Sequence, residues 1–262
     1  MSKSQKVEEN VAFIIGMPRS GTSSLYASLI SDEKIFFDLN KEPKYFSKKG
    51  GLRELTFKIK KKNKIIIDAS TDYFFQINYL NKIKNFNNNA KIILILREPT
   101  SWIFSLFKQW NRMKLVNNFE DLLFKTIKFN DKDFFKYKKN FLKNRIEFIL
   151  SNFKNVLVID FEKLDSLSTK KRLKKFLNIP MKNFSILHVN STLKKKSILP
   201  IKNFIKIFLK YKLIKIILNF FLKKVSNLKN KKYNFDNKTL KFAKKQMNDD
   251  IIYYNKIIKR VR

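Results

Sequence analysis

The chain has 262 residues, 44% of them hydrophobic, which is enough to fill the core of one large domain. It contains no cysteine, and this excludes disulfides, thiolate nucleophiles and cysteine-ligated metal sites. The 58 Lys and Arg residues against 21 Asp and Glu give a net charge of +37, which favours anionic partners such as nucleic acid, lipid headgroups or acidic glycans.

Two further features of the composition bear on partners and location. The chain is rich in Asn, Ile and Phe, which AT-rich codons favour. Coding bias therefore accounts for part of the Lys excess equally well as selection for an anionic partner. The first ten residues lack an apolar signal region, and no run of about 18 apolar residues occurs anywhere. We therefore expect a cytoplasmic protein without a secretory signal or a membrane span.

The first predicted elements are a buried strand at residues 11–15 and a helix that begins near residue 22. Leu25, Leu29 and Ile30 suit the packed face of such a helix. The sequence from residue 16 to residue 25 is GMPRSGTSSL. Gly16 and Gly21 allow a tight turn and a close approach to a ligand.

This loop has the donors that a phosphate group requires. The first N–H groups of the helix are unpaired, and Arg19 adds a planar guanidinium beside the hydroxyls of Ser20, Thr22 and Ser23. A Walker A loop has Lys directly after its second glycine, whereas here Thr22 follows Gly21. This difference counts against an ATP or GTP hydrolase. A strand, turn and helix that bind nothing remain the alternative.

The motif GMPRSGTSSL resembles the 5′-phosphosulfate loop of the PAPS-dependent sulfotransferases, in particular their bacterial and heparan-sulfate-type branch. The resemblance implies an α/β, P-loop-type three-layer fold, with a central parallel sheet flanked by helices and additional C-terminal helices. We expect one domain over residues 1–262, with a core at about 8–197 and a helical extension at about 198–262. The resemblance further implies that Arg19, Ser20, Gly21, Thr22 and Ser23 bind the co-substrate PAPS.

A short second strand at residues 34–37 leads to the sequence KEPKYF at residues 41–46. Pro43 disfavours helical geometry at Glu42, so we expect an extended loop or turn here. The pattern resembles the family segment that supplies the catalytic base. By that resemblance Glu42 takes the proton of the acceptor, and Lys41 lies close to the transferring sulfuryl group. The alternative for Glu42 is a solvated carboxylate. Residues 47–64 are polar and are predicted to be an exposed connection.

Residues 65–69 form a third predicted strand, followed by STDYF at residues 70–74. Because chemistry in parallel α/β sheets gathers at the carboxyl ends of strands, this segment belongs to the same crevice as the glycine loop. It resembles a family segment in which Glu stands at the position of Asp68, and in which heparan-type members have Lys at the position of Ala69. The side chains of Ser70 and Asp72 are predicted helix caps.

The sequence KIILILREPTSWIFS at residues 91–105 contains a wholly apolar strand that ends at Arg97. Pro99 then opens a helix, and Ser105 falls in its second turn. An Arg at this position suits bidentate binding of a phosphate, and Ser105 can reach the same group. The arrangement resembles the 3′-phosphate site of the family, in which a Ser follows the Arg by eight residues. A structural ion pair of Arg97 with Glu98 or Asp68 is the alternative.

The remainder of the chain gives weaker signals. Residues 102–149 are predicted to be helical, 155–162 to form the last strand, and 236–262 to be helical again. Residues 188–197 resemble the basic loop that closes over the nucleotide, which makes Lys195 a candidate contact. His188 is the single histidine and the alternative base. Residues 200–224 form a basic amphipathic stretch that either packs on the domain or lies on an anionic membrane.

Together these patterns predict a sulfotransferase that moves a sulfuryl group from PAPS to a hydroxyl or amine of an acceptor. The basic surface favours a glycan or glycolipid acceptor and peripheral contact with the inner membrane surface, and we expect no metal and no specific nucleic acid. A P-loop kinase or NTPase is the first alternative. A non-enzymatic binder of polyanions or anionic membrane is the second.

Overall fold

The computed structural model describes residues 11–30, 32–36, 40–61, 64–129, 132–179, 233 and 235–261. The chain divides into two units, one with residues 1–189 and 236–262 and the other with residues 190–235. The fold below is that of the first unit. The predictions for the loop at 188–197 with Lys195 and His188, and for the stretch at 200–224, lie outside the described residues. The single domain stays a prediction.

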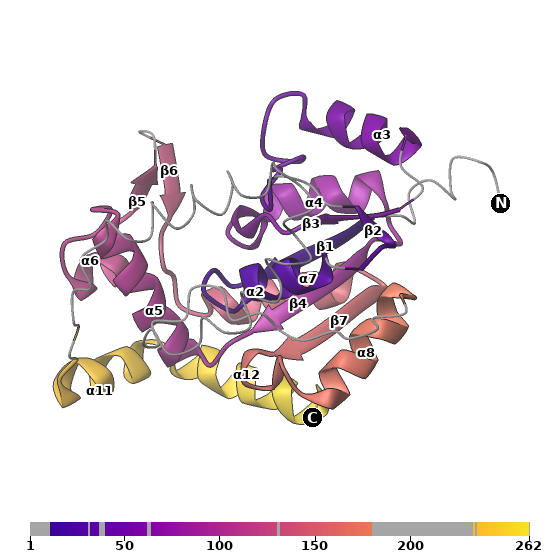
Figure 1. The fold of residues 1–262 in the computed structure, drawn as a ribbon. Coiled ribbons are helices and arrows are strands. Elements are labelled where there is room, and N and C mark those ends of the chain that lie inside the picture. The colour runs from indigo at the N-terminus through magenta and orange to yellow at the C-terminus, as the bar shows by residue number, and fades with distance from the viewer. Residues whose placement is uncertain are drawn as a thin grey trace, which may run out of the picture. The chain divides into compact units, whose positions relative to one another are not determined.

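Five parallel strands form the central sheet, in the order β2-β3-β1-β4-β7 (Figure 1). Their bounds are Val11–Gly16 for β1, Ile35–Phe36 for β2, Ile65–Asp68 for β3, Lys91–Leu96 for β4 and Asn155–Asp160 for β7. In the centre of the sheet Ile14 lies opposite Ile93. The predicted parallel sheet is therefore confirmed, and all its predicted strands are present.

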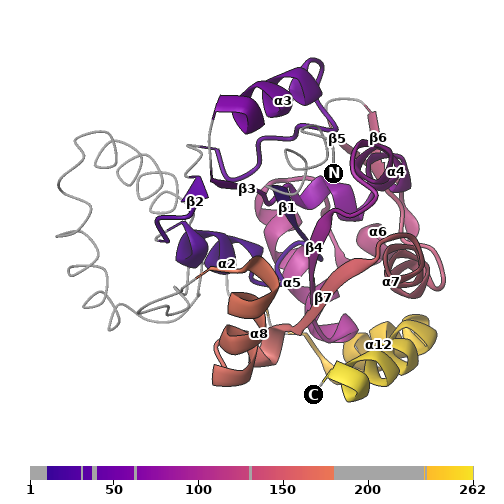
Figure 2. The same ribbon diagram turned by 90° about the vertical axis from the view of Figure 1, so that its right-hand side faces the viewer.

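Helices cover both faces of this sheet, which explains why its central strands are almost entirely apolar. Helices α2 (Thr22–Leu29) and α8 (Leu167–Leu177) pack on one face, where Leu25 and Leu173 meet the sheet residues Ile14 and Ile93. Helices α4 (Ile77–Phe86) and α7 (Phe141–Asn152) lie on the opposite face (Figure 2). The result is the three-layer α/β arrangement that was predicted.

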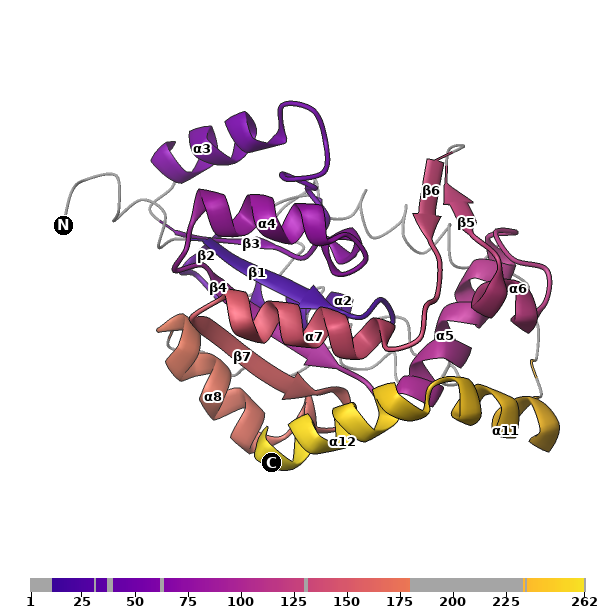
Figure 3. The same cartoon turned by 180° about the vertical axis from the view of Figure 1, so that it is seen from behind.

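Three further helices, α5, α11 and α12, lie beside these layers. Helix α5 (Pro99–Arg112) begins directly after β4, with Pro99 in its first turn and the Glu98 carboxylate accepting from the N–H groups of Thr100 and Ser101. At the C-terminus, α11 (Asn237–Gln246) and α12 (Asn248–Val261) run back along α5, α7 and β7 (Figure 3). This confirms the predicted helical character of the last stretch.

The structure corrects two predictions about connections. Residues 47–64 are not a plain exposed connection, because they contain α3 (Gly51–Lys61), whose Leu55 and Ile59 are buried at helical spacing. Residues 102–149 are not continuously helical. After α5 come α6 (Phe119–Phe124) and the antiparallel strands β5 (Ile127–Phe129) and β6 (Lys132–Phe135).

Local capping and aromatic packing explain this interruption. The Asn118 side chain and the Asp121 carboxylate form a capping box that begins a new helix after α5 has ended. The ring of Phe135 on β6 packs against Phe75 and Trp110, with centroids 5.1 and 5.3 Å away. The aromatic residues that suggested a helical core therefore pack between the β5–β6 hairpin and the elements next to it.

Candidate active site

The carboxyl ends of β1, β3 and β4 bring three polar segments to one edge of the sheet. These segments are the glycine loop at residues 17–21, the segment at 69–74, and Arg97 with the start of α5. In parallel sheets this edge is where ligands bind. The structure therefore places the sequence-predicted residues of all three segments on the same side of the molecule.

The glycine loop depends on both of its glycines. A Cβ at Gly16 would lie 2.9 Å from Ser20 Oγ and from Thr22 Cγ2, so the turn closes only around a residue without a side chain. Gly21 has φ 87°, and a Cβ there would lie 2.9 Å from a Leu164 methyl group. Gly21 is also the residue before α2, so the free N–H groups of that helix begin at this turn.

One buried hydroxyl of the loop is available to bind a ligand. Ser20 is fully buried, and its Oγ has no hydrogen-bond partner within the described part of the chain. A buried hydroxyl without a partner is costly unless a ligand supplies one. Arg19, beside it, has a positive φ of 70°, an uncommon conformation for a residue with a side chain. The loop is thus shaped at the expense of local stability, as ligand-binding loops often are.

Arg97 ties the glycine loop to α5. Its Nη1 donates to the Arg19 carbonyl at 2.9 Å, and its Nε and Nη2 donate to Ser101 Oγ at 3.1 and 2.8 Å. The Trp102 indole donates to the Pro18 carbonyl at 3.0 Å. The guanidinium of Arg97 also lies over the Phe161 ring, 4.7 Å from its centroid. Arg97 forms no ion pair with Glu98 or Asp68 within the described residues: Glu98 caps α5 and Asp68 bonds to Ser70 and Tyr73. The charges of Glu162 and Glu98 nevertheless act on Arg97, since both raise its pKa against the effect of burial.

Arg19 completes the connection, since its Nε donates to Ser105 Oγ at 3.3 Å. Burial lowers the pKa of Arg19, and the nearby positive charges of Arg97 and Arg112 lower it further. Burial is also the main cause that lowers the pKa of Arg97. The Nε of Arg112 is buried and lacks a hydrogen-bond partner among the described residues. Converging guanidinium groups of this kind are relieved by a bound anion, which suits a phosphate-containing ligand.

Glu42 and Lys41 lie at the start of α2. Lys41 Nζ is 2.9 Å from Glu42 Oε1 and 3.4 Å from Thr22 Oγ1, and the Thr71 hydroxyl donates to the same Glu42 oxygen at 3.1 Å. The side chains of Lys41 and Glu42 are 20% and 32% exposed, so both remain accessible to a ligand. The structure therefore brings Glu42, which the sequence placed on a separate loop, to the glycine loop.

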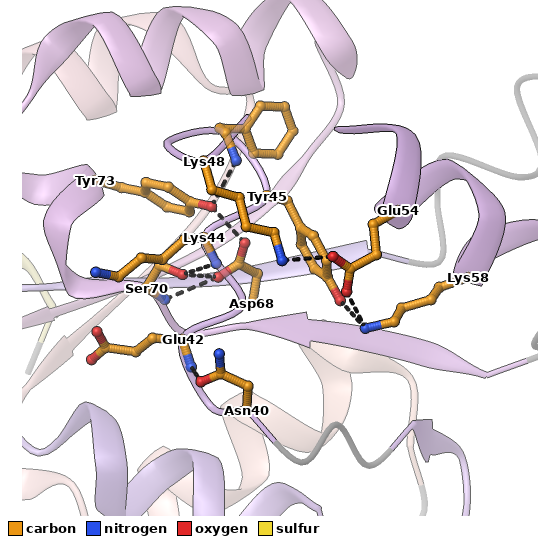
Figure 4. A network of polar contacts seen from close by, with 11 residues as sticks. Asn40, Glu42, Lys44, Tyr45, Lys48, Glu54, Lys58, Asp68, Ser70 and Tyr73 are labelled. Carbon is orange, nitrogen blue, oxygen red and sulfur yellow. Dashed lines mark hydrogen bonds and ion pairs between the residues drawn. The ribbon is translucent and has the colours of Figure 1, made fainter. Parts of the chain in front are cut away.

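Asp68 lies beneath this segment and is fully buried (Figure 4). Its Oδ1 accepts from the N–H and the hydroxyl of Ser70, and its Oδ2 accepts from the Tyr73 hydroxyl at 2.7 Å. Burial raises the pKa of Asp68 to about 6, although these hydrogen bonds oppose the shift. The predicted capping role of Ser70 is wrong, because the Ser70 side chain does not cap the short helix at Thr71–Phe74.

Asp72 also departs from the predicted capping role. Its Oδ2 accepts from the Ser47 hydroxyl at 2.7 Å, while its Oδ1 is buried and has no partner in the described ranges. Burial raises the pKa of Asp72, and the charge of Glu42 contributes in the same direction. Asp72, in the short helix that follows β3, therefore adds a contact to the segment that carries Glu42.

The sequence-predicted residues Arg19, Ser20, Gly21, Thr22, Lys41, Glu42, Arg97 and Ser105 thus share one edge of the sheet. Ser23 is half-buried in the first turn of α2, and its side chain makes no hydrogen bond within the described part of the chain. Sequence reasoning missed Ser101, Thr71 and Tyr73. For Ser101 a signal existed, since it follows Arg97 by one helical turn.

Among the described residues no group of three or more His, Cys, Asp or Glu side chains is arranged to hold a metal ion. Within those same ranges, no helix has the length and hydropathy needed to cross a membrane.

Comparison with known proteins shows the family of the chain and a solved structure with the same fold. Residues 9–251 match the family described as Sulfotransferase domain. The crystal structure of a sulfotransferase from Alicyclobacillus acidocaldarius superposes with a TM-score of 0.54 at 19% identity, covering 75% of this chain and 90% of that one. This likeness shows a shared fold.

Two further solved structures are similar at lower scores. The sulfotransferase domain from the curacin biosynthetic pathway gives a TM-score of 0.44 at 18% identity, covering 66% of this chain and 75% of that one. The mouse sulfotransferase SULT7A1 complexed with PAP gives 0.44 at 19% identity, covering 71% and 61%. No curated protein sequence matches the chain.

Proposed function

The chain belongs to the sulfotransferase domain family, and from this premise we propose that it transfers a sulfuryl group from PAPS (3′-phosphoadenosine 5′-phosphosulfate) to a hydroxyl or amine of an acceptor. One observation carries the proposal. Two separate anion-binding elements, the glycine loop and Arg97 with the start of α5, are joined by hydrogen bonds at one edge of the sheet. A ligand with phosphate groups at two ends, such as PAPS, uses both.

Each element has a distinct part in holding the co-substrate. The free N–H groups at the start of α2, with Ser20, Thr22 and Ser23, receive the 5′-phosphosulfate. Arg97 and Ser105 receive the 3′-phosphate, because a guanidinium fork and a hydroxyl suit that group. Arg19 lies between them, bonded to Ser105 by its side chain and to Arg97 by its carbonyl. Lys195 is proposed as a further contact from the resemblance alone.

Glu42 is the proposed general base. The acceptor oxygen or nitrogen forms a bond to sulfur, the bond from sulfur to the 5′-phosphate oxygen breaks, and the acceptor proton goes to the Glu42 carboxylate. Lys41 and Arg19 stabilise the negative charge that develops on the sulfuryl oxygens and on the leaving phosphate. The pairing of Lys41 with Glu42 and the contact of Lys41 with Thr22 support these two roles, because they put both side chains close to the glycine loop.

The acceptor class follows from charge. The net charge of +37 attracts acidic glycans and anionic lipid surfaces, so we propose a glycan or glycolipid acceptor and peripheral contact with the inner face of an anionic membrane. Asp68 and Ala69 stand where heparan-type members of the family have Glu and Lys. The acceptor is therefore expected to differ from heparan.

Calorimetric titration with PAP, 5′-AMP and Mg²⁺-ATP tests the proposal. PAP has both phosphates and 5′-AMP lacks the 3′-phosphate, so PAP should bind at least about tenfold more tightly, a difference of about 1.4 kcal/mol. Equal affinity for PAP and 5′-AMP would contradict the assignment of Arg97 and Ser105. Binding of Mg²⁺-ATP alone would favour a kinase or NTPase. A steep loss of binding to any polyanion with salt, without competition by PAP, would favour a non-enzymatic role.

A further inference from the structure

The segment that carries Glu42 has no regular secondary structure. Residues 40–50 form neither helix nor strand, although Tyr45 and Phe46 are buried. Pro43 has no N–H to donate, and Lys44 has a positive φ of 57°. A segment of this kind has little intrinsic preference for one conformation, so other parts of the chain must fix its path.

Five contacts with residues 69–73 fix it. The Lys41 carbonyl accepts from the Ala69 N–H at 3.3 Å, and the Glu42 carboxylate accepts from Thr71 at 3.1 Å. Farther along, the Lys44 N–H donates to Ser70 Oγ at 2.9 Å, the Phe46 N–H donates to the Tyr73 hydroxyl at 3.1 Å, and Ser47 donates to Asp72 at 2.7 Å. The contacts occur on both sides of Glu42, so they keep the segment in one conformation and also fix the position of Glu42.

Two of the five contacts lead to one buried group. The hydroxyls of Ser70 and Tyr73 both donate to Asp68, one to each carboxylate oxygen (Figure 4). A hydroxyl has one proton to donate and lone pairs with which to accept. Because both hydroxyls donate their hydrogen bonds to Asp68, their oxygens are left to accept hydrogen bonds from the backbone N–H groups of Lys44 and Phe46. The carboxylate thus sets the direction of the whole network.

We propose that Asp68, Ser70 and Tyr73 are positioning residues of the active site, which hold the segment at residues 41–47 so that the Glu42 carboxylate faces Lys41, whose Nζ contacts Thr22. The proposal rests on the proposed function, in which Glu42 is the base. A general base must lie within hydrogen-bond reach of the proton it accepts, and a displacement of about 1 Å lowers rates by about a hundredfold.

Packing alone does not account for a carboxylate at this position. Asp68 is fully buried in β3 next to the apolar residues Ile67 and Ala69, and burial of a carboxyl group costs stability unless its hydrogen bonds compensate. An apolar side chain would fill the same volume at lower cost. What an apolar side chain lacks is the ability to accept both hydroxyl protons, and through them to hold Lys44 and Phe46.

A double-mutant cycle separates positioning from general stability. Tyr73→Phe removes the contacts to Asp68 and to the Phe46 N–H while keeping the ring in place, and it is made alone and together with Glu42→Gln. Tyr137→Phe is the matched control, since the Tyr137 hydroxyl donates to the buried Asp250 at 2.9 Å in a different part of the unit. Conversion of PAPS to PAP is followed with octyl glucoside present, so that transfer to sugar hydroxyls and to water both count. PAP affinity is measured in parallel.

Tyr73→Phe should lower kcat by about 10 to 100-fold while the KM for PAPS and the affinity for PAP change less than about twofold. In the Glu42→Gln background the same change should have an effect below about twofold, because its target is already absent. Tyr137→Phe should leave kcat unchanged. An equal loss of kcat in both backgrounds, or a parallel loss of PAP affinity, would overturn the proposal.

Hydrogen exchange supplies a second test that needs no turnover. The N–H groups of Ser47 and Lys48 both donate to the Lys44 carbonyl rather than to the Tyr73 hydroxyl. Their protection should fall by about tenfold or more in Tyr73→Phe and stay unchanged in Tyr137→Phe. Unchanged protection in Tyr73→Phe would refute the positioning role. If the wild-type protein binds no PAP, the proposed function fails, whereas the exchange result still decides whether this network orders the segment.

Discussion

Replacement of Asp68 by Asn should make the stability of the protein less dependent on pH. Asn keeps an oxygen that accepts from Ser70, but it has no charge to bury. Burial raises the pKa of Asp68 to about 6 in the folded state, from an ordinary value of 3.8. The folded protein therefore binds the Asp68 proton more tightly than the unfolded chain does. The contribution of Asp68 to the free energy of unfolding consequently falls as the pH rises from about 4 to about 6.

The size of the effect follows from the two pKa values. Between about pH 5 and about pH 8, ionisation of Asp68 removes about 1.4 kcal/mol from the free energy of unfolding, and over the full range it removes about 3 kcal/mol. Because Asp68 is fully buried, solvent does not screen this contribution. The difference in stability between Asp68→Asn and the wild type should thus shift by about 1.4 kcal/mol in favour of the variant at the higher pH.

Urea unfolding followed by circular dichroism at both pH values measures this shift. Comparison of the variant with the wild type at each pH cancels the titration of every other carboxylate. Identical pH dependence of the two proteins would show that Asp68 does not titrate in this range. A shift of the opposite sign would show that its hydrogen bonds outweigh its burial, and the reasoning would then be wrong.

Three further predictions concern the ligand site. Arg19→Ala should lower kcat/KM for PAPS more than Glu42→Gln does, because electrostatic stabilisation outweighs a base whose contribution is about 10² to 10⁴-fold; steady-state kinetics that rank the two the other way would contradict this division of roles. Arg97→Lys should weaken PAP by about tenfold or more and leave 5′-AMP unchanged in calorimetry, since Lys has no guanidinium fork. Gly21→Ala should cost more stability than Gly50→Ala in thermal unfolding; both have positive φ, with a cost of about 1–2 kcal/mol, but only at Gly21 would the new Cβ meet other atoms. Equal costs would show that contact with Leu164 is unimportant.

Local sequence was sufficient to predict an element wherever the residues of that element alone determine its conformation. Apolar runs that end at glycine or arginine predicted β1 and β4, and both strands are present. The sequence placed Arg97 at the end of a strand and Ser105 in the second turn of the following helix, and the structure has Arg97 directly after β4 and Ser105 within α5. The sequence did not reveal that Arg97 bonds to Ser101 while Ser105 bonds to Arg19.

The hairpin of β5 and β6 and the helix α3 were missed for related physical reasons. Aromatic residues suit a helix face and a strand equally well, and only their packing partners decide between the two. Phe135 contacts Phe75, which is far away in sequence, so no local window contains that information. In α3 a lysine-rich composition concealed the two buried positions, Leu55 and Ile59.

The sequence by itself determined the family, the parallel sheet and many of the polar residues that gather at its carboxyl edge, because these follow from motifs and runs of fewer than about twenty residues. The tertiary structure alone decided how those residues meet. Glu42 pairs with Lys41, whose Nζ reaches Thr22, in a segment that Asp68, Ser70 and Tyr73 hold from β3 and the residues directly after it. Such hydrogen bonds join residues that are 26 or 27 positions apart, and their partners are chosen by the folding of the chain rather than by local preference.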